Sequence, residues 1–197
     1  MIKVGILGDI GSGKSFTAKQ FGCPVFDADK EVLKIYNKDK DCFIKLKKKI
    51  PEFITSFPIK KQELKKSILQ NMENLKKIEE IVHPKVQENM KKFIKINKKK
   101  KLLIFDIPLL IEKKNFKKNF IFIFVEAQKK DILKKLKIRK NYNNEIIKNL
   151  RKSQLSLKIK RKRSHYIIKN DFKRLNLKKR VKIIKEKILN NYERNST

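Results

Sequence analysis

The sequence predicts an α/β fold of three layers (α/β/α), in which helices cover both faces of a five-stranded parallel sheet. Three observations favour this class. Short apolar segments alternate with longer stretches of helical periodicity. Two of these segments, Leu102–Phe105 and Phe120–Val125, are apolar throughout, as expected of strands buried on both faces. All five glycines lie in the first 22 residues, which places a flexible loop beside the first strand.

The expected elements follow in order along the 197 residues. The strands are Ile2–Leu7, Pro24–Phe26, Leu102–Phe105, Phe120–Val125 and Tyr166–Ile168. The first helix, Lys14–Phe21, starts directly after the glycine-rich turn. Helical periodicity then covers about Lys30–Asn97, with breaks near Pro51, Pro58 and Pro84 because proline interrupts helices. Further helices are expected at Lys129–Arg139, Asn144–Gln154, about Leu155–Arg163 and about Leu177–Leu189.

The formal charge of +34 would suit a nucleic-acid-binding protein, because a basic surface attracts phosphate. Lysine, however, supplies 47 of the 54 basic residues, beside abundant Ile, Asn and Phe. The codons of all four residues are rich in A and T, so an A/T-biased genome explains the lysine content without a nucleic-acid partner. Residues 1–31 hold four lysines and four acids, so the glycine-rich region is locally neutral. No zinc pattern, helix-turn-helix signature or aromatic sheet motif accompanies the lysines. We therefore expect no specific nucleic-acid partner.

The apolar segments are too short to cross a bilayer, and the N-terminus has no cationic and apolar leader. Cys23 and Cys42 have no metal-ligand spacing and are interpreted as packing residues in a reducing compartment. We expect a cytoplasmic protein without a membrane partner, present as a monomer or weak homo-oligomer.

Residues Gly8–Ser15 match the phosphate-binding loop G-x-x-x-x-G-K-[ST], or P-loop, between a strand and a helix. Glycines let backbone N–H groups turn toward an anion, and the helix N-terminus adds its positive dipole end. Lys14 is expected to reach the β- and γ-phosphates, and the Ser15 hydroxyl to hold Mg²⁺. The predicted ATP-binding residues are Asp9, Ile10, Gly11, Ser12, Gly13, Lys14, Ser15 and Phe16.

The class of P-loop protein follows from motifs that the sequence lacks. A signalling GTPase needs a D-x-x-G switch, but no glycine follows Gly22. Asn37–Lys40 misses the base-reading N-K-x-D motif at its last residue. The glycine-rich signature of transport ATPases is also excluded, because it too would need a glycine after Gly22. A small-molecule kinase remains.

Two acidic motifs lie at expected strand ends. Asp106 ends an apolar strand in the manner of a Walker B element, so it either holds Mg²⁺ through water or caps the next turn. Asp27-Ala28-Asp29 ends the second strand, where this fold faces the γ-phosphate. One of the pair is expected to orient a substrate hydroxyl and the other to cap the helix through Lys30–Tyr36, with Asp27 the structural partner.

Together these motifs resemble those of the dephospho-CoA kinase family, in order and spacing, over essentially the whole chain. The matching residues are the P-loop, Asp27-Ala28-Asp29, His83-Pro84, Asp106-Ile107-Pro108-Leu109-Leu110-Ile111-Glu112, Gln154 and Ile167-Ile168-Lys169-Asn170. The resemblance implies transfer of the ATP γ-phosphate to the ribose 3′-hydroxyl of dephospho-CoA, the last step of CoA synthesis, with Mg²⁺. It also implies a P-loop NTPase-type core (about 1–29, 100–128 and 164–190), a helical CoA-binding insertion (about 30–99) and a helical lid (about 129–163).

Site residues follow from the same resemblance. Lys14, Asp29 and Arg139 are the expected catalytic residues, and Ser15 and Asp106 the expected metal ligands. The expected substrate-binding residues are Asp29, Lys61, His83, Pro108 and Leu109. His83 is interpreted as a structural or substrate-side residue where Pro84 breaks a helix, and His165 as inert.

The sequence also departs from the family pattern. Asp9 stands where the P-loop commonly has a second glycine, which is unfavourable near phosphate unless its side chain turns to solvent or caps the backbone. Leu7 replaces the usual threonine. The family's two lid arginines, four positions apart, correspond to Lys135 and Arg139, so only the first is replaced. Lys61 likewise replaces an arginine. Seven arginines all lie at or after position 139, so Arg151 or Arg163 is a further candidate for stabilising transferred charge.

Two other functions stay open from the sequence. One is a P-loop kinase that acts on a nucleoside or nucleotide. The other is a basic RNA-binding protein with a vestigial P-loop, whose RNA affinity would survive moderate salt.

Overall fold

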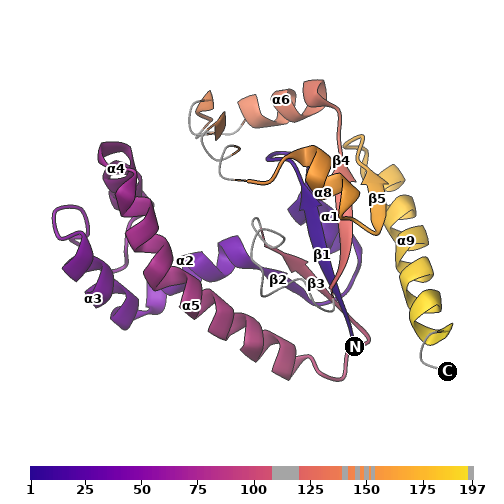
Figure 1. Cartoon of the computed structure of the whole chain (residues 1–197), viewed down its shortest axis with the longest axis horizontal. Helices are drawn as coiled ribbons and strands as arrows, with labels where there is room; N and C mark the ends of the chain where they lie inside the picture. The colour runs from indigo at the N-terminus through magenta and orange to yellow at the C-terminus, as the bar shows by residue number, and fades with distance from the viewer. Residues whose placement is uncertain (108–119, 139–141, 145–146, 149–150, 152–153, 195–197) are drawn as a thin grey trace. The chain divides into compact units, whose positions relative to one another are not determined.

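The computed structural model describes residues 1–107, 120–138, 142–144, 147–148, 151 and 154–194 (Figure 1). The chain forms two compact units. The first comprises Met1–Phe26 and Asn97–Thr197, and the second comprises Asp27–Ile96.

The first unit is built on a five-stranded sheet. Its strands are β1 (Ile2–Gly8), β2 (Val25–Asp27), β3 (Leu102–Asp106), β4 (Phe120–Glu126) and β5 (Tyr166–Lys169), in the order β2-β3-β1-β4-β5. β1 pairs in parallel with β3 and with β4, and β4 pairs in parallel with β5. In this register Gly5 lies between Phe105 and Phe122. The predicted five-stranded parallel sheet is confirmed.

Alternation along the strands gives the sheet two different apolar faces. Ile2, Val4 and Ile6 of β1 pack with α1 (Lys14–Gln20) and α9 (Arg174–Arg194). Phenylalanines of β3 and β4 line the opposite face, where the ring centroids of Phe105 and Phe120 are 5.1 Å apart. α8 (Leu157–Lys162) packs against β1, and α6 (Lys129–Lys137) follows β4. Burial on both faces explains why β3 and β4 are apolar without interruption up to their terminal acids.

The second unit is helical. It contains α2 (Ala28–Lys38), α3 (Lys40–Lys49), α4 (Lys61–Gln70) and α5 (Glu73–Ile96). Ten buried apolar residues from these helices and their loops form its core: Ile35, Tyr36, Cys42, Leu46, Ile50, Ile54, Ile59, Leu64, Ile78 and Val82. Asp39 ends α2 and caps α3, accepting hydrogen bonds from Cys42 N (2.8 Å) and from Lys85 Nζ on α5 (2.7 Å). The helices are therefore joined by both apolar packing and a charged cap.

The expected helix break at Pro84 is wrong, because α5 continues through this residue. Proline in a helix interior costs about 3 kcal/mol through a lost hydrogen bond and a steric clash. The buried stripe of α5 continues on both sides of it, with Ile78 and Val82 before and Met90 after. Burying one such side chain contributes about 1.5–3 kcal/mol, so packing outweighs the local penalty.

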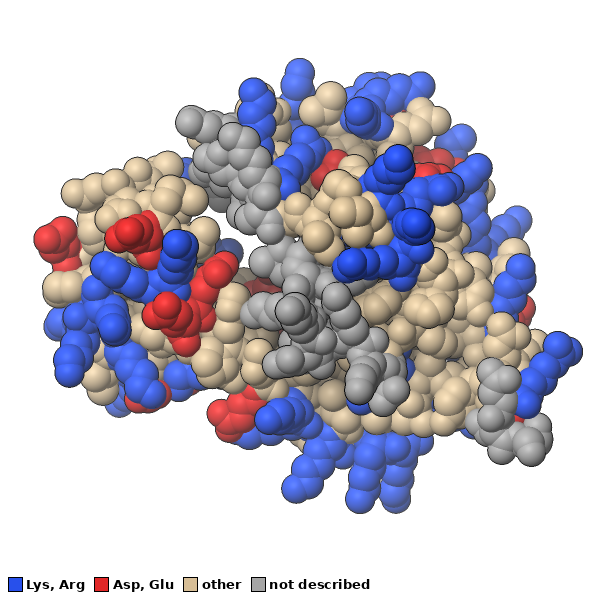
Figure 2. Space-filling view, viewed as in Figure 1, with Lys and Arg blue, Asp and Glu red and all other residues tan. Residues whose placement is uncertain are grey.

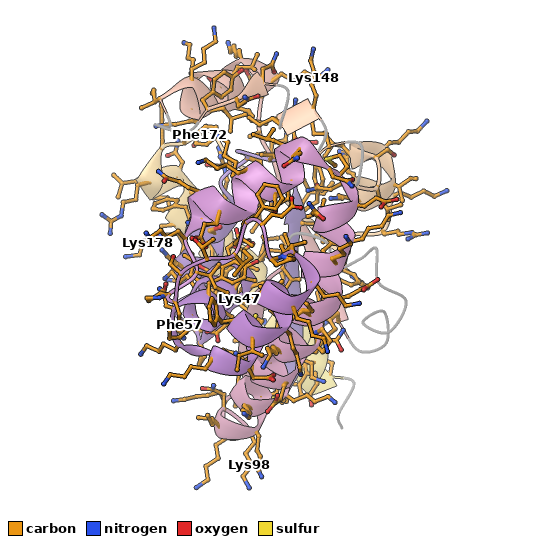
Figure 3. All side chains as sticks on the ribbon, turned by 90° about the vertical axis from the view of Figure 1, so that its left-hand side faces the viewer. Lys47, Phe57, Lys98, Lys148, Phe172 and Lys178 are labelled. Carbon is orange, nitrogen blue, oxygen red and sulfur yellow. The ribbon has the colours of Figure 1, made fainter. Side chains whose placement is uncertain are left out.

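Basic side chains are spread over the visible face of each unit, with acidic side chains among them (Figure 2). Figure 3 shows lysines such as Lys98 and Lys178 projecting away from the ribbon, and both are exposed. Lysines of this kind therefore form part of the solvated surface of the protein.

Candidate active site

The loop after β1 has the backbone that phosphate binding requires. Gly13 takes φ +88° at the N-cap of α1, where no side chain caps the helix and the first turn holds no acid. The first amides of α1 therefore have no side-chain acceptor at the cap, and the positive dipole end faces the loop. A Cβ on Gly8 would lie 2.7 Å from both Ser12 Oγ and Val125 O, so only glycine fits the start of the loop.

Lys14 turns its side chain back onto the loop. Its Nζ donates to the carbonyl of Asp9 at 2.7 Å and lies 3.3 Å from that of Gly8. The ammonium is thus held at the loop by two carbonyl oxygens. Ser15 and Phe16 are exposed on the first turn of α1.

Asn170, directly after β5, braces the loop from outside. Its buried side chain donates from Nδ2 to Ser12 O (2.8 Å) and accepts at Oδ1 from Phe172 N (2.9 Å), while its own N–H donates to Glu126 O (2.7 Å). A Cβ on Gly13 would collide with this amide. In the sequence, Asn170 stands out only as the last residue of the family resemblance, and no local pattern indicates its role.

Of the two arrangements expected for Asp9, the structure shows the second: its side chain caps the backbone and does not turn to solvent. It is 8% exposed and accepts from Ile10 N at 2.7 Å. Arg151 also donates to it with two nitrogens, Nε to Oδ1 at 3.0 Å and Nη2 to Oδ2 at 2.8 Å. The buried carboxylate is stable there because a planar guanidinium matches both of its oxygens.

Asp106 ends β3 and is buried, at 6% exposure. Because β1 and β3 are parallel neighbours, Asp106 lies at the sheet edge from which the P-loop departs. Within the described ranges, no three His, Cys, Asp or Glu side chains gather as a protein metal cage would need. Mg²⁺ in nucleotide sites takes most of its ligands from water and phosphates, so Ser15 and Asp106 fit that role without such a cage.

In the second unit, the two aspartates of Asp27-Ala28-Asp29 take different positions. Asp27 is the N-cap of α2, and its Oδ1 accepts from Lys30 N at 3.1 Å, which confirms the expected structural role. Asp29 lies in the first turn of α2 and is exposed. Of the two carboxylates in this motif, Asp29 is therefore the more exposed to solvent.

A pocket of about 610 Å³ opens in the second unit. It is lined by Leu33, Tyr36, Asn37, Pro58, Ile59, Lys60, Lys61 and Gln62. Lys60 and Lys61 begin α4, whose N-cap has no side-chain hydrogen bond. Lysine side chains beside a helix N-terminus favour anions over cations in such a pocket.

The remaining expected site residues are distributed as follows. His83 lies on α5 and is half-buried, and it is absent from the described lining of the pocket. His165 accepts from Phe122 N at Nδ1 (3.0 Å) and so fixes the start of β5. Arg139, Pro108 and Leu109 lie outside the described residues.

The P-loop follows the carboxyl end of β1, the central strand of a five-stranded parallel sheet, and a separate helical unit follows β2. This combination is typical of P-loop phosphotransferases. The family model described as dephospho-CoA kinase matches residues 2–175. The chain belongs to the dephospho-CoA kinase family, as the motifs indicated.

Individual relatives agree. The chain is 35% identical over 170 residues to a dephospho-CoA kinase of Wolbachia pipientis, covering 84% of this chain and 87% of the relative. It is 31% identical over 193 residues to that of Bartonella henselae, covering 95% and 98%. The solved dephospho-CoA kinase of Campylobacter jejuni matches in fold with a TM-score of 0.64 at 24% identity, covering 93% of this chain and 96% of that one.

Among the described helices, none combines the length and apolarity of a membrane span.

Proposed function

We propose that this chain transfers the γ-phosphate of ATP to the ribose 3′-hydroxyl of dephospho-CoA, giving CoA and ADP. The observation that carries the proposal is an intact phosphate-binding loop in a chain whose family model matches residues 2–175. Bound ATP with Mg²⁺ supplies the phosphoryl group and neutralises part of its charge.

On the nucleotide side, the loop amides and Lys14 hold the triphosphate. Lys14 already lies at the loop carbonyls, so its ammonium moves little when it binds phosphate. Ser15 and Asp106 hold Mg²⁺ in this proposal, Asp106 through water. Arg139 contributes positive charge to the transferred phosphoryl group.

On the acceptor side, Asp29 orients the 3′-hydroxyl and accepts its proton late in the reaction. Strong basicity is not needed, because the transition state of phosphoryl transfer is loose. The pocket beside Lys61 takes the substrate's diphosphate, since it combines two ammonium groups with a helix N-terminus. His83, Pro108 and Leu109 belong to the same proposal as substrate contacts.

The proposal further places the protein in the cytoplasm as a monomer or weak homo-oligomer, with small-molecule substrates and no specific nucleic-acid partner. Exposed lysines spread over both units support this last point (Figures 2 and 3). Their attraction for RNA is expected to collapse between low and physiological salt, as counterion release predicts.

The test is ADP release by purified protein with ATP, Mg²⁺ and a panel of acceptors, with mass spectrometry of the products. The expected result is CoA formation from dephospho-CoA and no turnover with nucleosides or nucleotides. The Lys14→Met variant controls for contaminating kinases and should show no turnover above background. Phosphorylation of a nucleoside or nucleotide, with no CoA formed, would assign the chain to a different kinase activity.

A further inference from the structure

The P-loop of this chain contains its own anion, the carboxylate of Asp9. The side chain of Asp9 is 11% exposed and sits among three donors: Ile10 N, Arg151 Nε and Arg151 Nη2. A carboxylate next to a triphosphate is repulsive unless a cation compensates it. Arg151 provides that compensation in a bidentate pair.

Asp9 contacts Lys14 as well as Arg151. Its carbonyl accepts from the Lys14 ammonium at 2.7 Å, while its carboxylate accepts from Arg151. One residue therefore holds two cations, one on its backbone and one on its side chain. The guanidinium is fixed beside the loop, although it comes from a segment 142 residues later in the chain.

Within the part of the chain that the structure describes, the guanidinium of Arg151 donates to Asp9 alone. An arginine has five N–H donors, and the two bonds to Asp9 take one from Nε and one from Nη2. The side chain of Arg151 is 40% exposed, so solvent and a dissolved ligand can reach it. A planar fork held at one edge by a carboxylate presents its other edge in a fixed direction.

We propose that Asp9 is a positioning residue that holds Arg151 beside the P-loop, and that Arg151 binds the triphosphate directly with its free edge. The inference rests on the proposed use of ATP. It assigns a function to the acid that replaces a glycine in the loop, and it gives the nucleotide site a phosphate-binding arginine separate from Arg139.

The test is the equilibrium affinity of the full chain for ATP and for ADP in single and double variants. Arg151→Met leaves the Asp9 anion uncompensated and is expected to weaken ATP binding at least about tenfold, and ADP binding less. Asp9→Asn is expected to weaken ATP binding about threefold to tenfold, because Arg151 loses its anchor. Removing a negative charge near an anionic ligand would by itself strengthen binding, so the sign of this effect is diagnostic.

Two further variants separate positioning from mere support of the fold. In the Asp9→Asn background, Arg151→Met should still weaken ATP binding about threefold, because a direct phosphate contact is lost. Arg151→Lys keeps the charge without the fork and should behave like Asp9→Asn. Arg180→Met is the matched control, since Arg180 is 39% exposed and pairs with Asp171 at 3.3 Å; its ATP affinity should stay within twofold of the parent. Melting temperatures without nucleotide report the purely structural part.

Tighter ATP binding by Asp9→Asn would overturn the proposal and show that Asp9 withholds Arg151 from the nucleotide. Equal losses for ATP and ADP in Arg151→Met, no larger than in Arg180→Met, would overturn it as well. Nucleotide affinity needs no acceptor. The expected affinities with no CoA formed would leave this inference intact and refute only the proposed acceptor.

Discussion

The substitution Gly13→Ala tests how the P-loop is held in place. Gly13 has φ +88°, and a Cβ there would collide with the Nδ2 of Asn170. A non-glycine residue in the left-handed region costs about 1–2 kcal/mol. Overpacking against a buried group, or the loss of the Asn170 bond to Ser12, adds about 1–3 kcal/mol. The free energy of unfolding should therefore fall by about 2–5 kcal/mol, measured by urea denaturation.

Gly22→Ala is the matched control for this experiment. Gly22 also has a positive φ, +61°, but an added Cβ there meets no atom within 4 Å. Only the conformational penalty applies, so the expected loss is about 1–2 kcal/mol. The difference between the two variants isolates the collision with Asn170.

A double-mutant cycle checks the cause of that difference. Asn170→Ala removes the colliding amide, so Gly13→Ala should cost about 1–3 kcal/mol less in that background than alone. Gly22→Ala should be additive with Asn170→Ala. The reasoning is refuted if Gly13→Ala costs no more than Gly22→Ala, or if its cost is unchanged when Asn170 is truncated.

Three further predictions concern the second unit. Asp29→Asn should lower kcat by roughly 10²–10⁴-fold in the coupled assay while ATP affinity stays near the parent value, and unchanged kcat would remove Asp29 from the mechanism. Lys61→Met should raise KM for dephospho-CoA about tenfold with little change in KM for ATP, whereas Lys66→Met on the exposed face of the same helix should change neither. Lys85→Met should lower the free energy of unfolding by about 1 kcal/mol near neutral pH. Burial favours the neutral forms of both Asp39 and Lys85, but their hydrogen bond dominates, lowering the pKa of Asp39 from 3.8 and raising the pKa of Lys85 from 10.5. The loss should therefore vanish as the pH falls below about 3.8 or rises above about 10.5, and a loss constant across denaturation curves from pH 2 to 11 would contradict this.

The parts of the fold that the sequence predicted are those specified by local pattern. The runs Leu102–Phe105 of β3 and Phe120–Val125 of β4 are apolar throughout because these strands are buried on both faces. The P-loop motif is complete within eight consecutive residues. The N-cap role of Asp27 was also predictable, because the Lys30 N–H that donates to its carboxylate is only three positions away. Pro84 shows the opposite case, because a local rule for helix ends was overridden by the buried face of α5.

The contacts that complete the P-loop were not predictable in this way. Asn170 reaches Ser12 across 158 positions, and Arg151 reaches Asp9 across 142. The residues next to Asn170 and Arg151 in the sequence do not indicate these partners. Each pair is brought together only when the chain folds, with its strands in the order β3-β1-β4-β5. The sequence could identify Asp9 as a misfit in the loop, but the partner that makes it tolerable is a property of the fold.

The identity of that partner bears on how this highly charged protein achieves selectivity. Lysines outnumber arginines 47 to seven, yet an arginine meets the carboxylate in the P-loop. Lysine offers a single point charge, whereas the two oxygens of Asp9 accept from two nitrogens held in one plane. Surface charges farther away than about 8 Å are largely screened at physiological salt, so the scattered lysines add attraction without direction. We therefore expect selective binding of a triphosphate to come from cations whose geometry is fixed at the loop. Among the described residues, Lys14 and Arg151 are held there through Asp9.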